Sequence, residues 1–247
     1  MKHLSRLLST LLVLNATASI AAPTSVPASG IASPQNKQIT STFDLRTTQV
    51  EVKGQDAVFS HTLQGDSGKV KPAPIGKLEG SSVAAYVWPT TLDSATVGFD
   101  AAQGILALAV TAHPDFDDTP LYDENGDGNK DNDGNEWHSH WVVLVEDETC
   151  GGKGALKVKD IPPGAQTMLP KTAPGLPILI DSPGYKPTLV GKIIEVSTPV
   201  GTNEFRYDGV TANLKVNDHG KAPLLCVVKV HDVASGDLSL PGKLIKK

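Results

Sequence analysis

Beyond its first 22 residues the chain of 247 has no apolar run approaching the roughly 20 residues that a membrane-spanning helix needs. We therefore expect no membrane span after that point. Basic residues are also scarce: 27 acidic side chains stand against 22 Lys and Arg. No segment offers the basic face that nucleic acid requires, so nucleic acid is not an expected partner.

Cysteine is equally rare, with only Cys150 and Cys226 present. In an oxidising compartment an isolated pair most simply forms one disulfide bond. The alternative is two buried free thiols, which behave as small apolar side chains.

Familiar enzyme motifs are missing too. The sequence has no nucleophile elbow, phosphate-binding loop or dinucleotide-binding fingerprint. An enzyme built on this chain would therefore have to depend on a metal, with a water bound to a His-ligated ion. We favour a binding or structural role over catalysis.

The N-terminus has the pattern of a signal peptide over residues 1–22. Lys2 and Arg6 precede the apolar stretch "LLSTLLVLNATASIA", and small residues allow cleavage after Ala18, Ala21 or Ala22. This predicts export to the periplasm or the extracellular space. The alternative is a disordered or buried N-terminus. Residues 23–42 are rich in Pro, Ser and Thr and predict a flexible linker, which leaves residues 43–247 as a single domain.

Within that domain no stretch has a convincing 3.6-residue apolar period. Short runs rich in Val, Ile and Leu recur instead, bounded by Gly, Pro, Asn or Asp. Examples are "GILALAVTA", "HWVVLVED" and "PLLCVVKVHDV". The pattern predicts an all-β fold, specifically a two-sheet antiparallel β-sandwich of immunoglobulin-like or jelly-roll-like type with long loops.

The acidity is concentrated in one segment, since residues 115–136 contain nine acidic residues and one lysine. Within it, "DENGDGNKD" alternates oxygen-bearing side chains with residues that permit tight turns, as a calcium loop does. The stretch resembles the first nine positions of an EF-hand loop, and also the calcium loops of thrombospondin type 3 repeats and dockerins. The predicted calcium ligands are Asp123, Asn125, Asp127, Asn129, Asp131, Asp133 and Glu136.

The segment departs from the EF-hand pattern at two positions. Gly134 stands where the bidentate Glu belongs, and Lys130 replaces an apolar residue. Asp133 or Glu136 is an alternative source of the missing carboxylate. The same alternation can also be started at Asp127, which gives a second, overlapping set of ligands. Two adjacent ions that share Asp127 and Asp131 are therefore another possibility. The resemblance predicts a loop and not a fold, and the alternative is a solvated acidic loop.

A different ligand chemistry follows directly in "WHSHW". On a strand, His138 and His140 point to one face and Trp137, Ser139 and Trp141 to the other. Two such imidazoles can chelate a transition ion such as zinc, copper or iron. A third ligand is expected from His113, or from Asp115, Asp117 or Asp118, if the strand ending at His113 pairs with residues 137–145. The alternative is a hydrogen-bonded His pair at the rim of a sheet.

Three functions therefore remain open. The first is an exported calcium-binding protein. The second is a transition-metal-binding protein or metal-dependent enzyme that uses His113, His138 and His140. The third rests on the order of strand, acidic loop and Trp-led strand, which faintly resembles DOMON-type domains that bind haem or sugar. That resemblance implies His138 or His140 as an axial ligand.

Overall fold

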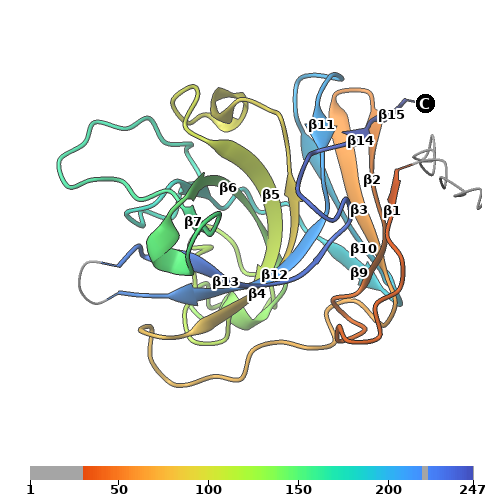
Figure 1. Cartoon of the computed structure of the whole chain (residues 1–247). Coiled ribbons are helices and arrows are strands. Elements are labelled where there is room, and N and C mark those ends of the chain that lie inside the picture. Colours follow the sequence, from red (N-terminus) through yellow and green to blue (C-terminus); the bar gives the residue numbers. More distant parts are fainter. Residues whose placement is uncertain (1–29, 219–221, 247) are drawn as a thin grey trace, which may run out of the picture.

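The computed structural model describes residues 30–218 and 222–246 and shows an all-β chain (Figure 1). The predicted signal peptide lies outside the described residues. The predicted linker is described only from Gly30 onward, and there it lies on the domain, because Ile31 is buried and pairs with the second strand. The described residues include no helix that is long and apolar enough to cross a bilayer.

The first sheet has the strand order β1-β2-β3-β10-β9 and is antiparallel, while β15 runs parallel to β2. Gly54 has a φ of +68° and forms the tight turn between β2 and β3. The bounds of this sheet are β1 Ile31–Ala32, β2 Leu45–Lys53, β3 Asp56–Leu63, β9 Thr188–Val190, β10 Ile193–Pro199 and β15 Ile245–Lys246. A small separate sheet pairs β11 Arg206–Tyr207 with β14 Gly242–Lys243.

The second sheet has the order β5-β4-β12-β13-β7-β6-β8, and an additional β5–β6 pairing closes it into a six-stranded barrel (Figure 1). Its strands are β4 Ser82–Pro89, β5 Ile105–Ala112, β6 His138–Glu146, β7 Leu156–Val158, β8 Ile180–Asp181, β12 Val210–Val216 and β13 Leu225–Val233. Three short 3-10 helices occur in the loops, η1 Ser94–Val97, η2 Asp133–Asn135 and η3 Glu148–Cys150. The all-β prediction is confirmed, whereas the specific sandwich type remains a prediction.

Two apolar cores result from the alternation of side chains along the barrel strands. One core contains Phe59 of the first sheet, which meets Trp88 and Trp141 of the barrel edge to face with ring centroids 6.0 Å apart. The other core fills the barrel interior and includes Val142 and Leu144. The β6 strand is therefore buried on both faces over most of its length.

The two cysteines form the predicted disulfide bond, with Cα atoms 5.3 Å apart. It joins η3 to β13 beside the place where β13 meets β7. Those two strands share only one register pair, Cys226 with Lys157. The disulfide therefore reinforces the weakest strand pairing of the barrel.

Candidate metal centre

The antiparallel pairing of β5 and β6 brings the predicted histidines together. Thr111 lies opposite His138 and Ala109 lies opposite His140 in the register. His113 follows two residues after Thr111 and so reaches the same end of the barrel. The two strands do pair, which is the condition on which the expected third ligand depended, and the three imidazoles lie together.

Asp118 completes the cluster from the loop after β5. One of its carboxylate oxygens, Oδ1, lies 3.2 Å from His113 Nε2, 3.1 Å from His138 Nε2 and 3.3 Å from His140 Nε2. The His113 and His138 Nε2 atoms are 3.0 Å apart. The four ligand atoms all lie within 4.8 Å of one another, and all four residues are buried. Such a group can hold a metal ion.

Hydrogen bonds at the outer ring nitrogens fix how each imidazole is turned. His113 Nδ1 donates to the carbonyl of Phe116 at 2.9 Å, and His138 Nδ1 donates to that of Glu136 at 2.8 Å. His140 Nδ1 lies 3.1 Å from Ser182 Oγ, which itself donates to the carbonyl of Asp118 at 2.6 Å. Because each Nδ1 carries a proton, each neutral ring presents an Nε2 lone pair to the centre, as in histidine metal sites.

The cluster needs a positive charge at its centre. The Asp118 Oδ1 and His140 Nε2 atoms are buried and have no partner in hydrogen-bond geometry, although they face each other. A buried carboxylate surrounded by lone pairs is costly unless a cation compensates it. A metal ion at the centre would satisfy all four groups at once.

The pKa shifts of Asp118 and His113 also reflect the attraction between the carboxylate and the imidazoles. Burial by itself raises the pKa of Asp118, but the imidazoles of His140 and His113 outweigh it and hold the pKa well below its ordinary value. Burial lowers the pKa of His113, yet the Asp118 carboxylate outweighs burial and raises it. Burial also lowers the pKa of His138 to about 4.

The other two predicted carboxylates have different roles. Asp115 Oδ1 accepts hydrogen bonds from the backbone N–H groups of Ile75 and Gly76. Asp117 accepts from the backbone of Thr119 and of Asp133. Neither belongs to the metal-binding group found among the described residues. Of the three aspartates proposed as a further ligand, the structure selects Asp118.

The acidic loop directs most of its side-chain oxygens at its own backbone. Asp123 accepts hydrogen bonds from the N–H groups of residues 126, 127 and 128. Asn125 accepts from the N–H group of Asp127. Asp133 is buried and accepts from the N–H groups of residues 124 and 125. These bonds give the loop a defined shape, and calcium binding by it remains a prediction.

Gly134 connects the end of this loop to the metal-binding cluster. Its carbonyl accepts the backbone N–H of His113 at 2.6 Å. A Cβ atom at this position would lie 1.7 Å from the carbonyl oxygen of Phe116, the same oxygen that orients His113. Only glycine fits there, so the residue that breaks the EF-hand pattern is required by the histidine cluster.

The cluster separates two hollows of different character. An outer cleft of about 420 Å³ reaches His138 and is flanked by Asp123, Glu124 and Glu136 of the acidic loop. An interior cavity of about 100 Å³ lies inside the barrel and reaches His113, Asp118 and His140. The outer cleft is therefore acidic where it approaches His138.

Ser182 contacts the cluster, and the sequence does not reveal it. It comes from the proline-rich segment after residue 160 and directly follows β8. A lone Ser in such a loop carries no signal. It contacts His140 only because β8 adds to the edge of β6.

Comparison with known proteins gives no relative: no family model matches this chain, and no curated protein or solved structure does either.

Proposed function

We propose that this protein binds one divalent transition-metal ion through His113, Asp118, His138 and His140. The observation that carries the proposal is the convergence of four buried ligand atoms within 4.8 Å, with three imidazoles already oriented by their Nδ1 hydrogen bonds. Metal ligands at about 2.0–2.1 Å from a tetrahedral zinc ion lie roughly 3.3 Å from one another. The contacts of 3.0–3.3 Å in the cluster are close to that separation.

Three nitrogen ligands and one carboxylate suit zinc, copper or iron better than calcium, which prefers six to eight oxygens. Calcium binding by residues 123–136 is a separate proposal that rests on the spacing of their oxygen-bearing side chains. Export is likewise proposed from the N-terminal sequence. A DOMON-like role in haem or sugar binding rests on the order of the segments alone.

Elemental analysis of the purified protein, together with its absorption spectrum, tests these proposals. We expect about one equivalent of a transition ion and no haem Soret band. Asp118→Asn or His140→Gln should weaken metal binding at least ~100-fold, because even residues that only orient a ligand typically contribute 10- to 100-fold. Asp115→Asn is the matched control and should keep the metal, since that carboxylate lies outside the cluster.

The proposal is wrong if the wild-type protein carries no transition ion after refolding with zinc or copper. It is also wrong if the Asp118→Asn variant keeps its metal as well as the Asp115→Asn control does.

A further inference from the structure

Three of the side chains that line the barrel interior are alanines. Ala85, Ala109 and Ala212 face inward from β4, β5 and β12, and Ala85 and Ala212 are direct register partners. Ala109 lies opposite His140. These alanines leave the interior cavity of about 100 Å³. An engineered apolar cavity of ~150 Å³ in another protein accepts benzene, so one benzene ring is the upper limit for the apolar part of a molecule that enters this smaller cavity.

The cavity is apolar except where it meets the cluster. Its only polar linings are Thr111, His113, Asp118 and His140, and the rest are aliphatic residues, Pro89 and Phe116. A molecule that fits there needs an apolar body and polar atoms at one end only. The polar end would face the metal ion.

Two of the three imidazoles, together with Asp118, face this cavity. The rings of His113 and His140 have centroids 6.4 Å apart, whereas each lies 4.7–4.8 Å from the ring of His138. The widest gap between two imidazoles therefore separates the two histidines that line the cavity. Asp118 Oδ1 lies between these two histidines, so a further ligand from the cavity would bind beside Asp118, as a fifth ligand of the kind that zinc accepts in some sites.

Charge balance indicates which ligand suits that position. A divalent ion, one Asp118 carboxylate and three neutral imidazoles sum to a single positive charge. Burying that charge is unfavourable unless an anion pairs with it. One monoanionic ligand makes the buried centre neutral.

The chain also provides a way into the cavity. The register of β13 against β12 shifts twice. Three valines of β13 therefore lie opposite three residues of β12, and all six line the cavity. The pairs are Val227 with Leu214, Val230 with Ala212, and Val233 with Val210. Val230 is nevertheless 51 % exposed. The cavity therefore meets the surface at Val230, on the part of β13 that follows its single pairing with β7 at Cys226.

We propose that the barrel interior binds a small apolar monoanion, of about the size of an aromatic carboxylate, with its carboxylate on the metal ion. The proposal rests on the metal centre proposed above and adds the class of molecule that the centre takes.

Titration of the cobalt-loaded protein tests this class, because cobalt replaces zinc and its visible spectrum reports on the ligands. Benzoate carries both an apolar body and a carboxylate, acetate carries the carboxylate alone and toluene the body alone. We expect benzoate to change the cobalt spectrum and to bind at least tenfold more tightly than acetate. Toluene should compete with benzoate without changing the spectrum.

Two variants locate the binding site. Ala212→Leu fills the cavity away from the metal ligands and should weaken benzoate binding at least tenfold while the cobalt content stays at one equivalent. Val230→Trp should slow benzoate association, whereas Val228→Trp should not, because Val228 lies on the same strand, is 50 % exposed and does not line the cavity. If the Ala212→Leu variant fails to fold, the comparison of Val230→Trp with Val228→Trp still tests the proposal.

Failure of this proposal is distinct from failure of the metal centre. Protein that binds no cobalt refutes both. Protein that binds cobalt but takes benzoate no more tightly than acetate refutes the cavity proposal alone. Equal effects of the Val228→Trp and Val230→Trp substitutions would also refute it.

Discussion

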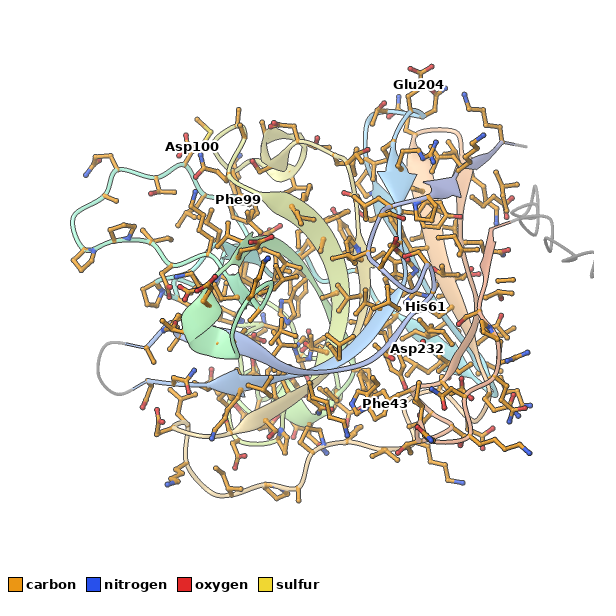
Figure 2. All side chains as sticks on the ribbon, in the orientation of Figure 1. Phe43, His61, Phe99, Asp100, Glu204 and Asp232 are labelled. Carbon is orange, nitrogen blue, oxygen red and sulfur yellow. A yellow bond between two sulfur atoms is a disulfide. The ribbon has the colours of Figure 1, made fainter. Side chains whose placement is uncertain are left out.

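His61 shows how one buried residue sets a pH dependence outside the metal centre. It lies on β3 (Figure 2). It is fully buried, and its ring stacks on Trp88 with centroids 4.0 Å apart. Burial lowers the pKa of His61 from 6.5 to about 3. The unfolded chain therefore takes up a proton here at a higher pH than the folded chain does.

Between pH 6.5 and about 3 the unfolded state binds more protons at His61, so stability falls as the pH falls through this range. The free energy of unfolding falls by up to about 1.4 kcal/mol for each pH unit. We expect His61→Phe to remove this contribution and keep an aromatic ring on Trp88. Urea denaturation of both proteins at several pH values measures it. A difference between the two proteins that stays constant from pH 7 to pH 4 would contradict the assignment.

The ligand residues also show what a sequence can and cannot specify. His138 and His140 share a face because strand side chains alternate, and His113 joins them once β5 pairs with β6. Asp118 could not be distinguished from Asp115 and Asp117, because the path of an irregular loop decides which carboxylate turns inward. Ser182 could not be found for the same reason, since it arrives from a distant proline-rich segment.

At the scale of elements, calcium binding by the acidic loop can be tested separately from the metal centre. We expect calcium to raise the thermal midpoint of the protein and a chelator to lower it, with stabilisation of about 2.7 kcal/mol when calcium is at ~100 times its dissociation constant. Asp123→Ala with Asp127→Ala should abolish this response. Calorimetry without a binding signal at millimolar calcium would refute the prediction.

A matched double variant shows whether loop and cluster act separately. His138→Ala with His140→Ala should remove the transition ion and leave the calcium response nearly intact. Loss of calcium binding in this variant would mean that the two form one composite site. The two sites are in contact, because the backbone N–H of His113 donates to the carbonyl of Gly134 at the end of the loop. The double variant shows whether this contact couples them.

The strands themselves were largely predictable, but their arrangement was not. The β6 segment is apolar on both faces toward its end, which predicts a strand covered on both sides. Closure of the second sheet into a barrel depends on the β5–β6 pairing and on the marginal β13–β7 contact. Such long-range pairings leave no local pattern, because each strand has the same composition in an open or a closed sheet.

For the whole molecule, the disulfide is the main covalent constraint. It closes a loop of 76 residues, which the chain-entropy model equates with about 4 kcal/mol of stability. We expect Cys150→Ser with Cys226→Ser to lower the free energy of unfolding by about that amount. Thiol titration of the denatured, unreduced wild type should detect no free thiol. Two titratable thiols would contradict the bond.

The shifts in β13 have a further consequence for how copies of the protein behave together. After Cys226, no other strand in the described parts of the chain pairs with the free side of β13. Exposed strand edges with apolar side chains such as Val228 and Val230 tend to recruit another chain and aggregate. Bulges and a lysine such as Lys229 spoil the regular hydrogen-bonding edge that such pairing needs. The irregular strand that admits a ligand therefore also protects the protein against edge-to-edge association.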